Sequence, residues 1–180
     1  MFDFAAHKAA SIAAYIPMRP RYEFFGETLL KLLRMCLAEE AVHNIEARAK
    51  TIDSFGDKAA SAADASADTP KYSEPLKQIT DLCGVRIIAY FPDALKSIES
   101  VLDKELIVIE RSDKSTAFEK SGRLGYQSIH FLVRLRPERE VLREYRDLAG
   151  LVAEIQLRTI LQHAWAEIEH DIQYKAPRGL

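Results

Sequence analysis

Two short runs in the second half of the chain gather side chains that bind ligands and transfer protons. They read GYQSIH at 125–130 and EIQLRT at 154–159, and in both runs polar residues alternate with apolar ones. Residues of one parity share a face of a β-strand. One run would therefore present tyrosine, serine and histidine on one side, and the other glutamate, glutamine and arginine. These types serve recognition and acid–base chemistry. For any single strand, a face turned toward solvent is the simpler interpretation.

A third run, RAKTIDSFGDK at 48–58, clusters cations where a strand is expected to turn into a helix. Arg48 and Lys50 would end the strand on one face. If the helix begins at residue 51 or 52, Ser54 and Lys58 lie one turn apart on the same side. Free backbone N–H groups and cations together make such a turn a cradle for a polyphosphate. The GxxxxGK[ST] pattern of a Walker A loop is absent. The alternative is an exposed basic helix start.

Polyphosphate chemistry needs a divalent cation to offset the charge of the ligand, and two carboxylates stand in suitable positions. Asp81 precedes an apolar run at 84–91, and Glu154 lies on the polar side of its strand. Mg²⁺ favours a few carboxylates combined with substrate oxygens, which predicts Mg²⁺ with Asp81 and Glu154 as ligands. His130 and His163 have neither cysteine partners nor the paired-histidine spacing that zinc requires.

Five predicted strands must hold these groups together. Alternation predicts strands over 44–50, 126–133 and 153–158, each with one apolar and one polar face. Nearly continuous apolar runs at 85–91 and 106–110 predict two central strands, joined by a helix over about 93–103. These elements predict a mixed five-stranded sheet with helices against it, an α+β (α/β) domain.

Helices are predicted at both ends of this strand region. The first 40 residues read as helical, with an apolar stripe formed by Phe25, Leu29, Leu32 and Cys36. A second helix is predicted over 159–173, with Thr159 as its N-cap. Its apolar stripe consists of Leu161, Trp165, Ile168 and Ile172. We therefore expect Trp165 to lie in the core.

The composition excludes several classes of protein. The chain has 180 residues, and 25 Lys and Arg against 27 Asp and Glu give a formal net charge of −2. A charge this close to zero argues against non-specific duplex binding over a broad face. The sequence contains no apolar run of about 18 residues and no signal peptide, so we expect a cytoplasmic domain without membrane contact. Cys36 and Cys83 belong to no CxxC pattern and are expected to be reduced thiols.

Five segments, taken in order, connect the chain to a known family. They read RAKTIDSFGDK (48–58), DLCGVRII (81–88), GYQSIH (125–130), EIQLRT (154–159) and HAWAEIEHDIQYK (163–175). With these segments the chain resembles the synthetase domain of the RelA/SpoT alarmone family, particularly its small, stand-alone members and their toxin-type relatives. The resemblance implies a nucleotidyltransferase-like fold, a synthetase domain over 43–175 and an N-terminal helical segment over 1–42.

The same resemblance implies an activity and its donor site. Family members use Mg²⁺ and move the β,γ-pyrophosphate of ATP onto the 3′-hydroxyl of GDP or GTP, which yields ppGpp or pppGpp and releases AMP. The residues that match the ATP-binding positions are Arg48, Lys50, Ser54, Lys58 and Arg86. Arg48 and Arg86 would sandwich the adenine. Asp81 matches the magnesium ligand, and Glu154 matches the carboxylate that assists magnesium and activates the 3′-hydroxyl.

An acceptor site is implied in the same way. The residues that match it are Lys120, Arg123, Tyr126, His130, Gln156, Arg158 and His163. Tyr126 would stack on the guanine, since tyrosine offers a flat surface with a polar tip. His130 would lie near the acceptor phosphates, and His163 would touch the edge of the base.

The loop before Tyr126 departs from the family pattern and leaves the acceptor open. It reads FEKSGRLGY at 118–126, where Lys120 and Arg123 keep positive charge but Leu124 replaces a polar residue. One alternative is a toxin-type relative that pyrophosphorylates the 3′ CCA end of tRNA or an adenine nucleotide. Another is an inactive nucleotide sensor, against which the presence of both candidate carboxylates argues. A homo-oligomer or an antitoxin partner would be engaged through a segment absent from this chain.

Overall fold

The computed structural model describes residues 2–64, 68–113 and 128–175, with residues 169–175 described by their backbone alone. The strands are β1 (Val42–Ala49), β2 (Cys83–Ala89), β3 (Leu106–Asp113), β4 (Ile129–Leu135) and β5 (Ala153–Thr159). The helices are α1 (Phe4–Tyr15), α2 (Arg19–Cys36), α3 (Ile52–Ala59), α4 (Pro75–Gln78), α5 (Ala94–Glu105), α7 (Pro137–Glu140) and α8 (Ile160–Lys175), and η1 (Arg146–Leu148) is a 3₁₀ turn. No helix in this described part of the chain has both the length and the apolarity to cross a membrane.

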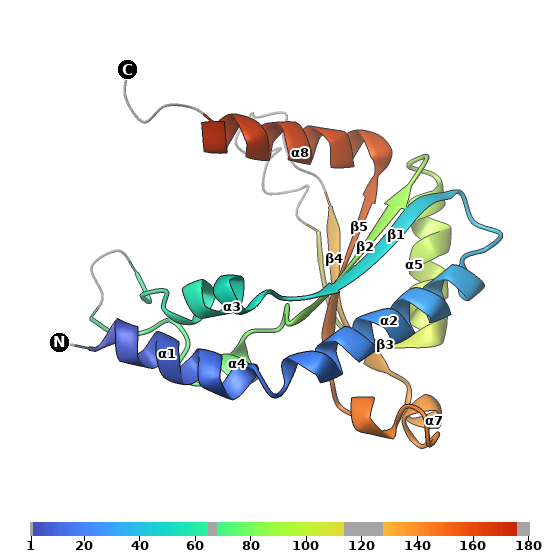
Figure 1. Cartoon of the computed structure of the whole chain (residues 1–180). Coiled ribbons are helices and arrows are strands. Elements are labelled where there is room, and N and C mark those ends of the chain that lie inside the picture. The colour runs from blue at the N-terminus through green and yellow to red at the C-terminus, as the bar shows by residue number, and fades with distance from the viewer. Residues whose placement is uncertain (1, 65–67, 114–127, 176–180) are drawn as a thin grey trace.

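The strands form one mixed sheet in the order β1-β2-β5-β4-β3 (Figure 1). β2 and β5 run parallel, whereas β1 with β2, β4 with β5 and β3 with β4 are antiparallel pairs. The predicted mixed five-stranded sheet is confirmed, but β3, which was expected to be a central strand, lies at an edge of the sheet. Inside the sheet, the pair of β2 and β5 brings two segments together that lie far apart in the sequence.

One face of the sheet is apolar and carries the core. Val85 and Ile87 of β2 and Ile155 and Leu157 of β5 are each at most 2% exposed. α2 packs on β1 and β2, while α5 packs on β3 and β5. Because side chains alternate along a strand, the intervening polar residues of β2 and β5 line the opposite face, and the candidate site lies there.

α2 carries the predicted apolar stripe, but its buried face is rotated slightly about the helix axis from the predicted one. Phe25 and Leu29 are fully buried as expected, and Leu33 extends the buried stripe with 0% exposure. Leu32 and Cys36, which the spacing placed in the stripe, are only half-buried. The buried residues therefore follow the 3.6-residue period of a helix, and the side that carries Phe25, Leu29 and Leu33 packs into the core.

Adjacent phenylalanines on α2 give a matched prediction for stability. Phe25 is fully buried, whereas Phe24 is 43% exposed. We expect Phe25→Ala to lower the free energy of unfolding by about 3–5 kcal/mol, because truncation removes buried surface and leaves a cavity. Phe24→Ala should change it by less than about 1 kcal/mol. Urea unfolding followed by circular dichroism measures both variants, and equal losses would contradict this packing of α2.

α8 begins close to the predicted position but does not bury its apolar stripe. Thr159 caps it as expected, because its Oγ1 accepts a hydrogen bond from the backbone N–H of Gln162 (3.3 Å). Leu161, Trp165 and Ile168 are 80%, 48% and 54% exposed. The expectation that Trp165 lies in the core is wrong. Among the described residues, α8 packs on β5 and β2, and neither strand covers the stripe.

Candidate active site

A cavity of about 330 Å³ opens on the polar face of the sheet, beside β1, β2, β5 and the start of α3. Its lining includes these predicted site residues: Arg48, Lys50, Ser54, Asp81, Arg86, Glu154 and Gln156. Glu46 and Thr51 also line it and were missed by the sequence prediction. The sequence could have identified both, since Glu46 has the strand parity of Arg48 and Thr51 stands at the expected start of the helix.

The register of the strands arranges the polar residues in two rows across the sheet. One row runs from β1 to β4 through Glu46, Arg86, Gln156 and His130. The neighbouring row runs from β1 to β5 through Arg48, Gly84 and Glu154. Gly84 has no side chain, so the second row contains an open place between the arginine and the glutamate.

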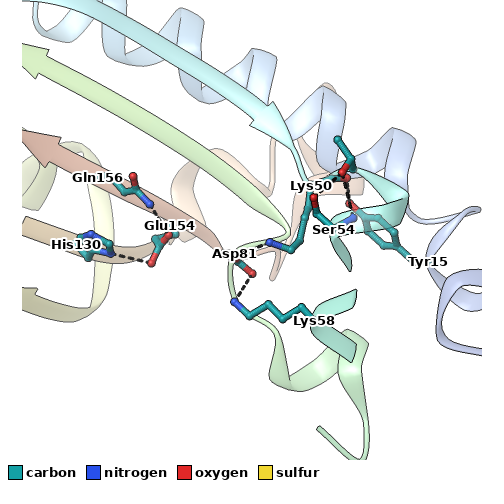
Figure 2. Close-up of polar contacts among 9 residues, drawn as sticks. Tyr15, Lys50, Ser54, Lys58, Asp81, His130, Glu154 and Gln156 are labelled. Carbon is teal, nitrogen blue, oxygen red and sulfur yellow. Dashed lines mark hydrogen bonds and ion pairs between the residues drawn. The ribbon is translucent and has the colours of Figure 1, made fainter. Parts of the chain in front are cut away.

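The turn between β1 and α3 has the predicted strand-to-helix form. Thr51 caps α3, because its Oγ1 accepts a hydrogen bond from the Ser54 N–H (3.2 Å) and donates one to Ser54 Oγ (2.8 Å). Tyr15 of α1 donates from Oη to the carbonyl oxygen of Lys50 at 2.8 Å (Figure 2). The ring of Tyr15 stacks on Phe55 with centroids 4.4 Å apart. α1 thus fixes the backbone of the turn.

Two lysines hold Asp81 at the cavity (Figure 2). Lys50 Nζ donates to Oδ2 at 2.8 Å, and Lys58 Nζ lies 3.0 Å from Oδ1. Burial raises the pKa of the Asp81 carboxyl, but the hydrogen bonds and charges of the two lysines outweigh burial and lower this pKa overall. Asp81 is therefore ionised at neutral pH, and its charge is balanced by both ammonium groups.

Glu154 receives hydrogen bonds on both of its carboxylate oxygens (Figure 2). His130 Nδ1 lies 3.0 Å from Oε1, and Gln156 Nε2 donates to Oε2 at 3.0 Å. The bond from His130 is the largest influence on the pKa of Glu154 and lowers it, burial raises it, and the bond from Gln156 lowers it again. The net pKa is lowered, so a second ionised carboxylate lines the same cavity.

Polar contacts continue outward from Glu154 in two directions. Ser128 Oγ lies 2.7 Å from His130 Nε2, and Arg158 Nη2 donates to Gln156 Oε1 at 2.9 Å. Ser128 and Arg158 are each 2% exposed. Ser128 was absent from the predicted site, although it shares the strand parity of His130.

Arg86 lies between acidic residues from two elements. Its Nη1 is 3.5 Å from Glu46 Oε2 and 3.8 Å from Glu167 Oε1 of α8. His163, also on α8, has its Nδ1 3.8 Å from the same Glu167 oxygen. Burial, followed by the charges of Arg158 and Arg86, lowers the pKa of His163. α8 therefore brings His163 to the polar side of the sheet, close to Arg86.

Three predicted acceptor residues, Lys120, Arg123 and Tyr126, lie outside the described residues. Within the described ranges, no group of three or more His, Cys, Asp or Glu side chains could hold a metal ion. A cation held by Asp81 and Glu154 would therefore need further ligands from a bound molecule.

The family of the chain follows from a comparison with known protein families. The family described as "Region found in RelA / SpoT proteins" matches residues 47–178, which is well over half of the chain. The chain belongs to the RelA/SpoT family. The match covers β2, β3, β4, β5 and α8 together with the end of β1, and it confirms the resemblance found in the five sequence segments.

Curated relatives of this RelA/SpoT protein include the GTP pyrophosphokinase YjbM of Bacillus subtilis (strain 168), which is 33% identical over 108 residues. That match covers 57% of this chain and 47% of the relative. The chain spans about half the length of the curated relatives it matches.

Solved structures of similar proteins share the fold. A GTP pyrophosphokinase family protein from Streptococcus pneumoniae aligns with a TM-score of 0.70 at 24% identity, over 90% of this chain and 77% of that chain. The small alarmone synthetase 1 from Bacillus subtilis, bound to its product pppGpp, aligns with a TM-score of 0.62 at 25% identity, over 93% of this chain and 81% of that chain. The predicted α+β fold with a mixed five-stranded sheet is thus confirmed.

Proposed function

We propose that this RelA/SpoT protein is a pyrophosphokinase that transfers the β,γ-pyrophosphate of ATP to the 3′-hydroxyl of GDP or GTP. The products would be ppGpp or pppGpp, and AMP. The observation that carries the proposal is a single cavity in which the cations of the β1–α3 turn lie beside two ionised carboxylates. The name of the relative YjbM and the pppGpp bound to a similar structure support the same reaction.

Arginines on neighbouring strands would hold the adenine of ATP. Arg48 and Arg86 line the cavity from the same face of β1 and β2. A guanidinium group stacks on a purine through its flat face and still carries charge. The Ser54 hydroxyl and the backbone N–H groups of Ile52 and Asp53 would bind phosphate oxygens, since the first N–H groups of a helix have no partner within the helix. The Ser54 N–H is already capped by Thr51.

Asp81 and Glu154 would hold Mg²⁺ together with the phosphates of ATP. Both carboxylates line the cavity and both have lowered pKa values. This donor set fits a cation that takes one or two carboxylates and completes its coordination with phosphate oxygens and water. When bound, Mg²⁺ supplies positive charge that offsets the charge on the phosphate oxygens.

Lys50 and Lys58 would change partners when ATP binds. In the structure, both ammonium groups are paired with Asp81. Phosphate oxygens form strong charge-assisted hydrogen bonds with lysine, so the triphosphate would draw the lysines away. The Asp81 carboxylate then becomes available for a cation that arrives with the nucleotide.

Transfer then requires positioning and charge neutralisation rather than a covalent intermediate with the protein. The acceptor 3′-oxygen forms a bond to the β-phosphorus of ATP. The bond from this phosphorus to the oxygen that bridges it to the α-phosphorus breaks, and AMP leaves with that oxygen. Glu154 accepts the proton of the 3′-hydroxyl. Tyr126 would stack on the acceptor base, with Lys120 and Arg123 near its phosphates.

Gly84 gives a prediction about where the nucleotide lies. Glycine weakens a strand, and its presence there often marks the close approach of a ligand. A Cβ at Gly84 would come no closer than 4.0 Å to the Arg48 carbonyl oxygen, so the fold itself has room for a side chain. We expect Gly84→Val to keep its thermal stability but to weaken ATP binding by at least about 10-fold, because the valine side chain would occupy space that the nucleotide needs. A 10-fold loss corresponds to about 1.4 kcal/mol of binding free energy.

Isothermal titration of ATP into Gly84→Val measures this loss. Glu110→Val is the matched control, since Glu110 lies in the same cross-strand row on β3 but outside the cavity. Unchanged ATP affinity in Gly84→Val would mean that the nucleotide does not lie over β2.

A transfer assay tests the proposed function. The protein is incubated with Mg²⁺ and ATP labelled at the γ-phosphate, with GDP, GTP, ADP and deacylated tRNA offered in parallel. We expect label on the guanine nucleotides. Label on ADP or tRNA would instead assign a toxin-type acceptor, and ATP binding without any transfer would assign a nucleotide sensor. Either result would overturn the proposal.

A further inference from the structure

We infer that Ser128 is a positioning residue for Glu154 and acts through His130. Ser128 and His130 form one hydrogen-bonded arm, which ends on one oxygen of the Glu154 carboxylate. Arg158 and Gln156 form a second arm, which ends on the other oxygen. The inference rests on the proposed function, in which Glu154 accepts the proton of the acceptor hydroxyl. It assigns a function to a buried hydroxyl that does not line the cavity.

The direction of the first arm follows from the chemistry of its ends. An ionised carboxylate can only accept hydrogen bonds, so the His130 Nδ1 that lies 3.0 Å from Glu154 Oε1 must carry a proton. In a neutral ring, Nε2 is then an acceptor. The Ser128 hydroxyl, with Oγ 2.7 Å from Nε2, is therefore the donor to it. Donation runs from Ser128 through His130 to Glu154.

The second arm has the same polarity. A guanidinium group can only donate, so the Gln156 atom that faces Arg158 Nη2 at 2.9 Å is its carbonyl oxygen, Oε1. This orientation turns the amide nitrogen of Gln156 toward Glu154 Oε2, to which it donates at 3.0 Å. Two chains of donors thus end on the two oxygens of one carboxylate. Figure 2 shows the last bond of each chain, from His130 and from Gln156 to Glu154.

Burial makes the outer member of each arm a support rather than a ligand contact. Ser128 and Arg158 are each 2% exposed, so neither offers its side chain to a molecule in the cavity. Glu154, His130 and Gln156 are partly exposed and lie on the polar face. Each carboxylate oxygen has two lone pairs, and the arms occupy one on each oxygen. The two arms thereby hold the remaining lone pairs in a fixed direction, as the transfer of a proton from the acceptor hydroxyl to Glu154 requires.

Ser128→Ala tests the first arm, with Ser128→Thr as the conservative variant that keeps the hydroxyl. We expect Ser128→Ala to lower kcat for pyrophosphate transfer by about 10-fold, in the range seen when a residue that orients a ligand-holding group is removed. KM for ATP should stay within about twofold of the unmodified protein, since this residue does not line the cavity. Ser128→Thr should recover most of kcat. A parallel rise in KM, or no recovery in Ser128→Thr, would overturn the inference.

A double-mutant cycle tests whether Ser128 acts through His130. His130→Asn keeps an N–H donor near the position of Nδ1 but offers nothing to the Ser128 hydroxyl. In the His130→Asn background, Ser128→Ala should therefore cause no further loss of kcat. A loss that multiplies with that of His130→Asn would show that the hydroxyl works independently, and would overturn the inference.

Nitrogen-15 NMR of the His130 ring gives a readout that does not depend on turnover. At about pH 8, where imidazole is ordinarily neutral, we expect the unmodified protein to carry the ring proton on Nδ1 and Ser128→Ala to show a mixture of tautomers. A proton on Nε2 in the unmodified protein would overturn the inference. If this signature is found but no acceptor receives pyrophosphate, the proposed function fails while the arrangement of the arm stands.

Discussion

Replacing Asp81 with asparagine is expected to reduce pyrophosphate transfer about 1,000-fold, which corresponds to about 4 kcal/mol of activation free energy. The variant loses the negative charge that would bind Mg²⁺ together with Glu154. It also removes the partner of Lys50 and Lys58, whose ammonium groups lie 2.8 and 3.0 Å from the carboxylate. The two consequences affect different steps, so they can be separated by measuring binding and turnover independently.

Binding of ATP without Mg²⁺ should be as tight as in the unmodified protein, or tighter, in Asp81→Asn. In this variant no carboxylate competes with the phosphate oxygens for Lys50 and Lys58, so the lysines can contact ATP without first leaving a partner. The free energy of unfolding should fall by about 1–2 kcal/mol, between the small effect of an exposed ion pair and the large effect of a buried one. The Asp81 and Lys50 side chains are 23% and 17% exposed, which places the pair between these limits.

Isothermal titration in EDTA and a steady-state transfer assay measure these two effects. Asp53→Asn is the matched control, because Asp53 is an exposed aspartate in the first turn of α3 and does not line the cavity. If ATP affinity in EDTA fell together with turnover, Asp81 would serve to hold the fold of the site rather than to bind the cation.

Residue parity was the most informative part of the sequence. It assigned Arg48, Glu154 and Gln156 to the polar faces of two strands, and all three line one cavity in the structure. Arg86, which lines the same cavity, was identified only through the family resemblance. Parity is informative for a local reason, since side chains on a strand alternate between its two faces whatever lies next to it. The helix start at Ile52 was predictable for a similar reason, because Thr51 offers a capping hydroxyl directly before it.

Strand neighbours and burial depth were not predictable in this way. Arg86 lies opposite Glu46 on β1 and opposite Gln156 on β5, and this pairing depends on how the apolar faces pack over long distances in sequence. Parity also failed to predict that Arg158 is 2% exposed. The apolar stripe containing Trp165 identified one face of α8, but no property of the stripe indicates which surface covers it.

Glu154→Gln is expected to lower kcat about 1,000-fold, within the range of about 100- to 10,000-fold that acid–base catalysis contributes, while ATP affinity stays nearly unchanged. The amide fills the same volume but cannot accept a proton from the acceptor hydroxyl. Its NH₂ group also donates, whereas His130 and Gln156 both donate toward this position. Either one of these two partners must therefore turn away, or the ring proton of His130 must move to Nε2.

Single-turnover transfer by rapid quench measures the chemical step, and titration of ATP measures binding. Glu110→Gln is the matched control, because Glu110 is an exposed glutamate on β3 in the same cross-strand row. A chemical step slowed less than about 10-fold would show that Glu154 is not the proton acceptor. An equal loss in ATP affinity would assign Glu154 to cation and nucleotide binding, and the base would then have to be sought among other groups on the polar face.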